Sequence, residues 1–244
     1  MKPEEKVLLV ILLIQGWSES GAWKNALIRT VLEKIPGVRV VVAEYLDGKG
    51  RLAQFKSHKT VEQYADQVLQ CYLQTMAQYP KVPIMVVGHS LGGIIARLLC
   101  KLGYFPSRDL VLVGTPNGGI SYKFLGGPII GLFTFPLCWV LSFILKVPVF
   151  RQLLEGSRFI WNLNLKGIPE DAHYIYGIKD RLPRWSSDPH SIGIAVYCNH
   201  HLFPFNGKTM EELDCGETEE LKNSAIPEVV RFVYKRLAEI KAAS

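Results

Sequence analysis

The feature of this sequence that most constrains its fold is a serine flanked by glycines, placed between a predicted strand and a predicted helix. Gly88-His89-Ser90-Leu91-Gly92 matches the pattern G-x-S-x-G, and Gly93 follows it. Residues 83–87 form an apolar run typical of a buried strand, and residues 94–99 predict a buried helix. The glycines remove β-carbons that would clash in so sharp a turn. We therefore expect a nucleophilic Ser90 at a helix N-terminus, where N–H groups and the helix dipole favour negative charge.

The remainder of the chain alternates short apolar runs with longer segments of helical period. Strands are predicted at residues 7–14, 38–44, 82–87, 110–113, 173–177 and 192–198. Helices are predicted at residues 22–34, 60–78 (capped by Thr60), 91–102 and 226–241. This alternation is typical of a parallel sheet covered by helices, and we find no internal repeat or low-complexity linker. The 244 residues are therefore expected to fold as one α/β domain.

Composition and charge exclude several classes of protein. With 48% hydrophobic and 20% charged residues, the chain has enough apolar surface for a core, which excludes disordered and collagen-like chains. The net charge is +6, but the basic residues are scattered rather than clustered, so we expect no nucleic-acid partner. The five cysteines contain no CxxC pair, so they predict reduced thiols rather than a zinc or redox site.

The first residues have two interpretations. Lys2 and Lys6 precede the apolar run 7–14 as in a signal peptide, but no small-residue cleavage site follows. A run of eight apolar residues that ends at Gln15-Gly16-Trp17 suits a central strand buried on both faces. We favour the strand, and expect an intracellular protein that is cytoplasmic or peripherally associated with a membrane.

One long uncharged segment interrupts the alternation. Residues 124–145, bracketed by Lys123 and Lys146, are 22 residues without a charge, a length that could cross a bilayer. The segment also contains the helix breakers Gly126, Gly127, Pro128, Gly131 and Pro136. We favour a lid or a membrane-dipping hairpin over a core helix or a membrane span. The expected lid residues are Leu132, Phe133, Phe135 and Trp139.

These motifs together resemble the α/β-hydrolase superfamily, and more narrowly its lipases and esterases. Residues 88–93 resemble the nucleophile elbow, and Gly114-Thr115-Pro116-Asn117-Gly118-Gly119 resembles the G-T-P-x-x-G turn of lipases. Residues 154–159 with Leu163-Asn164 are similar to the segment that returns from the lid. Gln15-Gly16-Trp17 resembles the first loop, with Gln15 in place of the usual histidine. The resemblance implies one α/β-hydrolase domain over residues 1–244, with a mostly parallel sheet flanked by helices and a lid or cap insertion at about 118–170.

The resemblance also implies a catalytic histidine that follows the acid in the chain. That order eliminates His58 and His89 and leaves His173, His190, His200 and His201. His173 starts a strand and His190 precedes the last one, whereas the base belongs on the loop after the last strand. His200 and His201 lie there, and both stay open as the base, with Asn199 before His200 as a slight preference.

The remaining catalytic groups follow from the same resemblance. Asp180, in the G-x-x-D turn of residues 177–180, is the expected acid, with Asp188 as the alternative. The backbone N–H groups of Leu91 and Trp17 are expected to form the oxyanion hole. No metal or organic cofactor is implied.

The expected activity is hydrolysis of a carboxylic ester of a lipid, or of another acyl-chain substrate, through an acyl-enzyme on Ser90. The uncharged segment favours an acyl chain, because burial of aliphatic carbon contributes ~0.8 kcal/mol per CH₂. Thioesterase and acyltransferase activities use the same triad and stay open. A noncatalytic membrane-associated scaffold on this fold is the alternative from another class. The expected partners are a hydrophobic ester and, through the insertion, a membrane surface.

Overall fold

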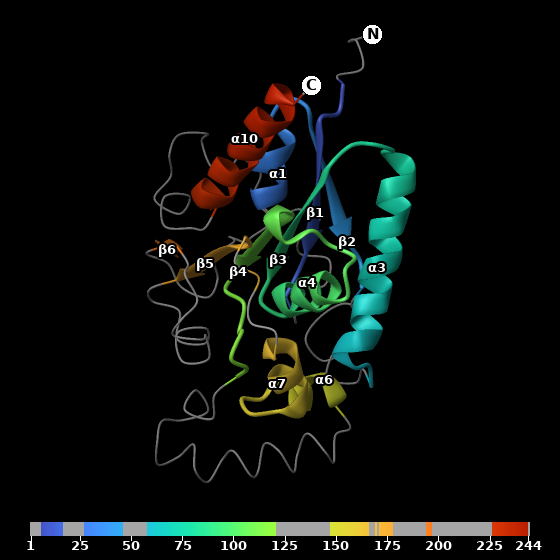
Figure 1. Cartoon of the computed structure of the whole chain (residues 1–244), viewed down its shortest axis with the longest axis vertical. Coiled ribbons are helices and arrows are strands. Elements are labelled where there is room, and N and C mark those ends of the chain that lie inside the picture. Colours follow the sequence, from blue (N-terminus) through green and yellow to red (C-terminus); the bar gives the residue numbers. More distant parts are fainter. Residues whose placement is uncertain are drawn as a thin grey trace.

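A parallel sheet forms the centre of the molecule in its computed structural model (Figure 1). The structure describes residues 6–16, 27–45, 58–120, 147–165, 169, 171–177, 194–196 and 226–243. Six strands lie in the order β2-β1-β3-β4-β5-β6, and each neighbouring pair is parallel. They are β1 (Leu9–Ile14), β2 (Val38–Ala43), β3 (Ile84–His89), β4 (Leu110–Val113), β5 (His173–Gly177) and β6 (Ile194–Val196).

The described helices cover both faces of this sheet. They are α1 (Leu27–Glu33), α3 (Val61–Gln78), α4 (Leu91–Lys101), α6 (Pro148–Leu153), α7 (Arg158–Asn164) and α10 (Ile226–Ala242), with the short 3₁₀ helix η2 (Ser107–Asp109). Successive side chains of a strand point to opposite faces, so β1 contributes to two cores. Val10, Leu12 and Ile14 pack with α3 and α4, whereas Leu9, Ile11 and Leu13 pack with α1 and α10. Burial on both faces explains why β1 is apolar throughout.

The predicted elements are confirmed in type wherever the structure describes them. Thr60 caps α3 as predicted: its hydroxyl accepts from the Gln63 N–H, and the Gln63 side chain accepts from the Thr60 N–H. This reciprocal pair satisfies two N–H groups that lack a partner within the helix. The prediction for β3 ended too early, because the strand extends to His89. Ser90 therefore follows the last residue of the strand directly.

The strand order determines where a ligand site belongs. The chain passes from β1 to β2 on one side, then crosses over to β3 on the other side of β1. In open parallel sheets, ligands bind outside the carboxyl ends of the strands at such a reversal of direction. Ser90 lies there, since Ile14 at the end of β1 is in register with Gly88 near the end of β3.

Candidate active site

Ser90 occupies a strained turn between β3 and α4. Its backbone has φ 51° and ψ −118°, an uncommon conformation for a residue with a β-carbon. The Ser90 N–H donates to the carbonyl of Val113 at the end of β4, at 3.0 Å. Its own carbonyl accepts from the N–H groups of Gly93 and Ile94, at 3.0 and 3.3 Å. The turn is therefore held from both sides, and it places a partly exposed serine at the first turn of a buried helix.

The flanking glycines allow the chain segments to approach closely. A β-carbon at Gly88 would lie 2.8 Å from the Gly92 carbonyl oxygen, and one at Gly92 would lie 2.1 Å from the Ile14 carbonyl oxygen. A β-carbon at Gly93 would lie 1.9 Å from Oγ1 of Thr115. The G-x-S-x-G pattern is thus explained by contacts between β1, β3 and α4, as well as by the conformation of the serine.

The first N–H groups of α4 lie directly after Ser90 in the chain, where the sequence predicts one donor of an oxyanion hole. The N–H groups of the first turn of a helix have no acceptor within that helix, and Leu91 is the first residue of α4. The carbonyls of Ile14 and Gln15 lie against Gly92, so the end of β1 adjoins this turn. Trp17, which is expected to contribute the second N–H, lies outside the described residues.

Several other predicted site residues also lie outside the described residues. These are Asp180, His200, His201, the alternatives Asp188 and His190, and the lid residues Leu132, Phe133, Phe135 and Trp139. Their roles stay predictions. His173, rejected as the base, begins β5 at the amino end of the strand, away from Ser90.

The sequence analysis did not identify the role of a buried arginine in α4, the helix that follows Ser90. Arg97 of α4 is 2% exposed. Its Nη1 donates to Oδ1 of Asn117 at 3.0 Å, and its Nη2 donates to Oδ1 of Asn164 at 2.7 Å. Nδ2 of Asn164 in turn donates to the main-chain carbonyl of Asn117 at 2.9 Å. The available signal was a single charge within the otherwise apolar stretch 94–99.

Ile120 and Leu154, which lie before and after residues 121–146 in the chain, are neighbours in the structure. The Ile120 N–H donates to the Leu153 carbonyl, and the Glu155 N–H donates to the Ile120 carbonyl at 2.6 and 3.0 Å respectively. Ile120 and Leu154 form a parallel bridge. Gly119, with φ 90°, allows this approach, since a β-carbon there would lie 2.8 Å from the Glu155 nitrogen. Backbone hydrogen bonds therefore join two segments of the predicted 118–170 insertion, one before and one after residues 121–146.

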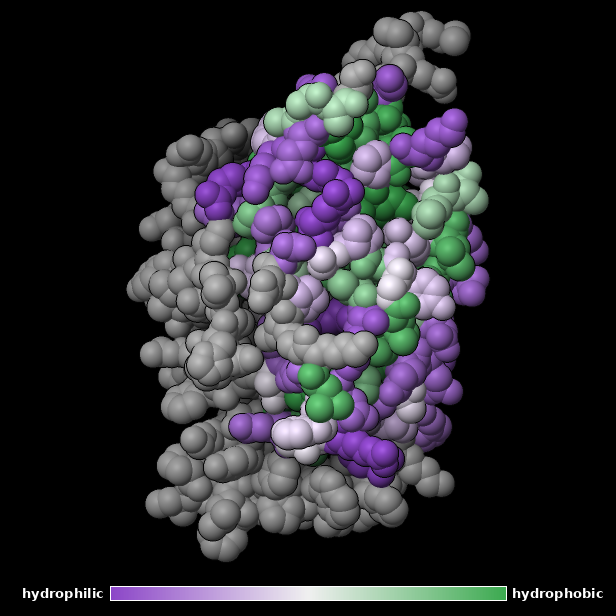
Figure 2. All heavy atoms as spheres, in the orientation of Figure 1, coloured by the Kyte–Doolittle hydropathy of each residue, from purple (hydrophilic) through white to green (hydrophobic). Residues whose placement is uncertain are grey.

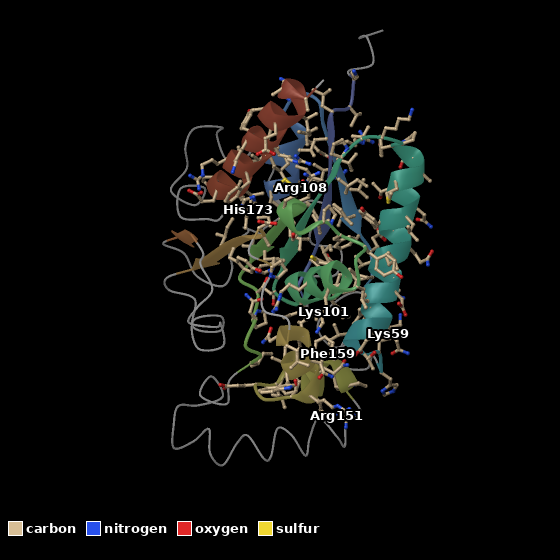
Figure 3. All side chains as sticks on the ribbon, viewed as in Figure 1. Lys59, Lys101, Arg108, Arg151, Phe159 and His173 are labelled. Carbon is tan, nitrogen blue, oxygen red and sulfur yellow. The ribbon has the colours of Figure 1, made fainter. Side chains whose placement is uncertain are left out.

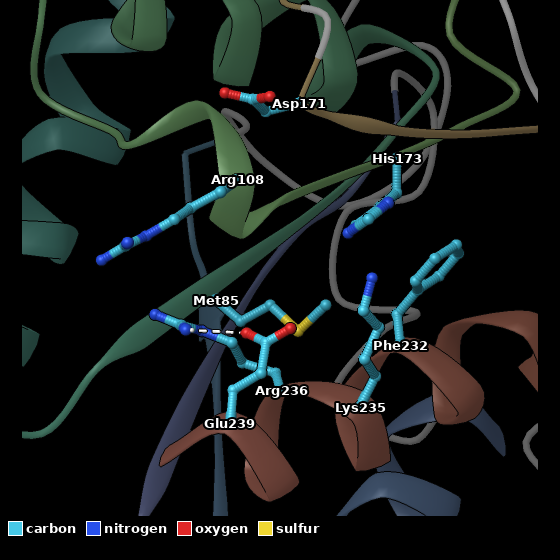
Figure 4. Close-up of a pocket in the computed structure, with 8 residues that line it drawn as sticks. All are labelled: Met85, Arg108, Asp171, His173, Phe232, Lys235, Arg236 and Glu239. Carbon is cyan, nitrogen blue, oxygen red and sulfur yellow. Dashed lines mark hydrogen bonds and ion pairs between the residues drawn. The ribbon is translucent and has the colours of Figure 1, made fainter. Parts of the chain in front are cut away.

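Two pockets lie among the described residues, at different places in the fold. One, of about 430 Å³, lies between α4, α6 and α7, where Lys101 and Phe159 are near each other (Figure 3). Hydrophilic side chains predominate over the described part of this face of the molecule (Figure 2). The other, of about 370 Å³, lies at the amino ends of β3 and β5 (Figure 4). There the His173 ring stacks on Phe232 of α10, with centroids 3.9 Å apart. The second pocket therefore lies at the amino ends of the strands, whereas Ser90 lies at their carboxyl ends.

Burial controls the titration of the groups near this core. Desolvation raises the pKa of Tyr174 to about 12, although the Arg97 charge opposes the rise. Burial also raises the pKa of the Cys71 and Cys100 thiols, which are free cysteines. Cys138, Cys198 and Cys215 lie outside the described residues.

Within the described ranges, no cluster of three His, Cys, Asp or Glu side chains could hold a metal ion. No helix in these ranges is long and apolar enough to cross a membrane.

A family model matches the part of the chain that contains the nucleophile turn. The model for Lipase (class 3) matches residues 13–102, less than half of the chain, from the end of β1 through α4. No curated protein matches the sequence. The match supports the lipase-like interpretation of the Ser90 turn.

Solved structures were also compared with this fold, and the similar ones have low sequence identity. An extracellular α/β-hydrolase from a Paenibacillus species has a TM-score of 0.52 at 18% identity, over 89% of this chain and 97% of that chain. Phospholipase PlaB from Legionella pneumophila has a TM-score of 0.48 at 18% identity, over 74% of this chain. This chain covers 41% of the length of PlaB. The likeness to the Paenibacillus protein concerns the fold alone.

Proposed function

We propose that this chain, which has the α/β-hydrolase fold, is a serine hydrolase that cleaves carboxylic esters. The observation that carries the proposal is the backbone of Ser90, with φ 51° and ψ −118° between a parallel strand and a helix. Strained residues of this kind cluster at active sites. A nucleophile elbow uses this strain to expose a serine Oγ at the top of the sheet.

In the proposed reaction, Ser90 Oγ attacks the acyl carbon while its proton passes to a histidine, either His200 or His201. Asp180 orients that histidine, and the N–H groups of Leu91 and Trp17 hold the oxyanion. Collapse of the tetrahedral intermediate breaks the bond to the alkoxide, which takes the proton and leaves as an alcohol. Water then attacks the acyl-enzyme by the same route, releases the carboxylic acid and restores Ser90.

The proposed substrate class is an ester with an aliphatic acyl chain. The carboxyl ends of β1 and β4 adjoin the Ser90 turn, and Ile120 is bridged to Leu154, which follows residues 121–146 in the chain. A pocket covered by such a segment would desolvate an acyl chain and leave polar esters without partners. The same segment is proposed to contact a membrane surface peripherally.

Labelling with a fluorophosphonate probe tests the nucleophile. The expected result is one covalent adduct at Ser90, located by mass spectrometry, which does not form when the protein is heat-denatured before the probe is added. Folded protein that does not react would contradict the hydrolase and favour a noncatalytic scaffold.

A series of p-nitrophenyl esters and acyl-thioesters of increasing length tests the substrate class. We expect kcat/KM for esters to rise with chain length over several carbons. A higher kcat/KM for matched thioesters would instead identify a thioesterase.

A further inference from the structure

The carboxyl end of β1 lies against the first turn of α4, the helix that begins directly after Ser90. A β-carbon at Gly92 would lie 2.1 Å from the carbonyl oxygen of Ile14 and 2.6 Å from that of Gln15. Gly92 follows Leu91, the first residue of α4. Contacts this close leave little room for one segment to move without the other. The position of the Gln15 carbonyl therefore affects the position of the Ser90 turn.

The Gln15 carbonyl accepts a hydrogen bond from the hydroxyl of Tyr45, which is 30 residues away in the chain. Ile14 is the last residue of β1 that pairs with β2, so Gln15 lies just beyond the regular pairing of the sheet. Gln15 is 3% exposed, and a buried carbonyl that loses its partner costs about 1–3 kcal/mol. The Tyr45 hydroxyl thus fixes the direction of a carbonyl at the point where β1 ends.

Tyr45 is itself held in the core on the α3 and α4 side of the sheet. Its side chain is 2% exposed, and it belongs to the same buried cluster as Ile14 and Leu91. Its ring packs edge-to-face on the ring of Tyr64 in α3, with centroids 5.5 Å apart and planes at 75°. This geometry is favourable for two aromatic rings whether or not they carry hydroxyls. A phenylalanine at position 45 can therefore retain the packing and lose only the hydrogen bond.

We propose that Tyr45 is a positioning residue which, through the Gln15 carbonyl and Gly92, holds the first turn of α4 and thereby keeps Ser90 in the geometry needed for attack on the acyl carbon. The proposal rests on the proposed function, because it presupposes ester hydrolysis at Ser90. Tyr45 is assigned no contact with the substrate or with the reacting atoms. Misplacement of a reacting group by ~1 Å can reduce the rate about 100-fold, so a loosened turn affects kcat more than the binding of a small ester.

The test compares Tyr45→Phe with Tyr174→Phe, a matched control. The Tyr174 hydroxyl, on a side chain that is 8% exposed in β5, also donates to a main-chain carbonyl, that of Pro169, at 3.2 Å. Each variant loses one hydroxyl-to-carbonyl hydrogen bond, so we expect similar decreases in Tm. With p-nitrophenyl acetate, we expect kcat of Tyr45→Phe to fall about 10-fold while KM stays within about 2-fold of the wild type. Both constants of Tyr174→Phe should stay within about 2-fold.

A conservative replacement tests whether the donor itself matters. Tyr45→4-aminophenylalanine keeps the ring and an N–H donor, so its kcat should lie between those of the wild type and Tyr45→Phe. If Tyr45→Phe does not fold, this variant provides the same comparison with Tyr174→Phe. Unchanged kcat in Tyr45→Phe would overturn the proposal, and so would equal losses in Tyr45→Phe and Tyr174→Phe, which would indicate a general loss of stability.

Hydrogen exchange in residues 88–94 provides a readout that does not depend on activity. We expect faster exchange there in Tyr45→Phe than in Tyr174→Phe, because only the first variant releases the carbonyl that lies against Gly92. Equal exchange in the two variants would overturn the positioning role.

The proposed function fails separately, if the wild type neither reacts with the fluorophosphonate nor hydrolyses the ester. The effect on kcat then has no meaning, and hydrogen exchange still decides whether Tyr45 fixes the Ser90 turn.

Discussion

At Ser90 the chain maintains a backbone conformation that costs roughly 1–3 kcal/mol for a residue with a β-carbon. Its surroundings hold it there, since the Ser90 N–H is bonded to β4 and its carbonyl is bonded to the first turn of α4. A serine that served only as a helix cap would not need this strain. In α4 the Ser90 side chain makes no capping hydrogen bond to the helix, so its hydroxyl is not committed to that role.

Two substitutions of Ser90 distinguish the effect of the hydroxyl on catalysis from the effect of backbone strain on stability. We expect Ser90→Ala to lose ester hydrolysis by ~10⁴-fold or more while its Tm stays near that of the wild type, because alanine retains the β-carbon. Ser90→Gly should be equally inactive but more stable by about 1 kcal/mol, because glycine adopts this φ without strain. Activity of Ser90→Ala within tenfold of the wild type would reject Ser90 as the nucleophile.

The neighbouring glycines should differ in whether a second substitution can rescue them. Gly92→Ala meets the backbone carbonyls of Ile14 and Gln15, whereas Gly93→Ala meets mainly the Thr115 side chain. Overpacking typically costs ~1–3 kcal/mol, so both variants should melt several degrees below the wild type.

Thr115→Ala should raise the Tm of Gly93→Ala, because the β-carbon at position 93 meets Oγ1 of Thr115. It should leave the Tm of Gly92→Ala unchanged, because the β-carbon at position 92 meets backbone carbonyls instead. Oγ1 of Thr115 has no hydrogen-bond partner among the described residues, so its removal alone should cost little. Equal rescue of both variants, measured by thermal unfolding, would contradict this account of the glycines.

For single residues, the sequence predicts a role when that role depends on neighbours in the chain. Ser90 was found because its strand, turn and helix are contiguous in the chain. Arg97 was missed because its partners Asn117 and Asn164 are 20 and 67 residues away. Asp180 and the choice between His200 and His201 stay predictions, because these residues lie outside the described ranges.

Helices that are stabilised by their own sequence can be predicted from it, whereas helices that depend on tertiary contacts cannot. α3 has a capping box and a continuous apolar face, so its sequence alone predicts it. The short helices α6 and α7 were not predicted, because helices of one or two turns are marginal without tertiary contacts. Here Gln152 of α6 accepts from the Val61 N–H at 2.7 Å and donates to Glu62 of α3 at 2.6 Å.

The contact between β5 and α10 should be sensitive to acid. Burial lowers the pKa of His173, and the nearby Lys235 and Arg231 lower it further, against the opposing charges of Glu239 and Asp109. The unfolded chain therefore binds a proton at a higher pH than the folded protein does. The contribution of His173 to stability is present above pH ~6.5 and is lost as the pH falls towards its lower folded pKa.

Melting temperatures between pH 8 and pH 5 test this linkage. The Tm of the wild type should fall more steeply than that of His173→Phe, in which an apolar ring can stack on Phe232 without titrating. His58→Gln, at an exposed position, is the control and should follow the wild type. Parallel slopes for the wild type and His173→Phe would show that His173 does not contribute to the acid sensitivity.

For the whole molecule, the parallel sheet separates two cores and brings the strand ends to one edge. The strand order could not be read from the sequence, because the same alternation of strands and helices suits several orders. The observed order puts the reversal of direction between β1 and β3, next to Ser90. The His173 pocket lies at the amino ends of β3 and β5, away from the carboxyl ends that adjoin Ser90.

The proposal of a lipid substrate depends most on the uncharged segment of residues 124–145. Its 22 uncharged residues cannot all face water without an apolar patch beyond the ~300–600 Å² usual for a soluble monomer. A lid over the acyl site would cover one side of the segment, and a lipid surface would cover the other. The glycines and prolines within it would then serve as hinge points.

We therefore expect ester hydrolysis to increase when micelles or liposomes are added. Replacement of Leu132, Phe133, Phe135 and Trp139 by polar residues should reduce liposome binding and turnover of long-chain esters about tenfold, because these side chains would no longer cover an acyl chain or enter the lipid. Turnover of an acetate ester should change little, since it requires only the nucleophile turn and the triad. If these residues instead pack as core, the same variant loses both activities together and melts at a lower temperature. That result would reject the lid and leave the hydrolase proposal intact, because the described hydrogen bonds of the Ser90 turn are made with β4 and α4.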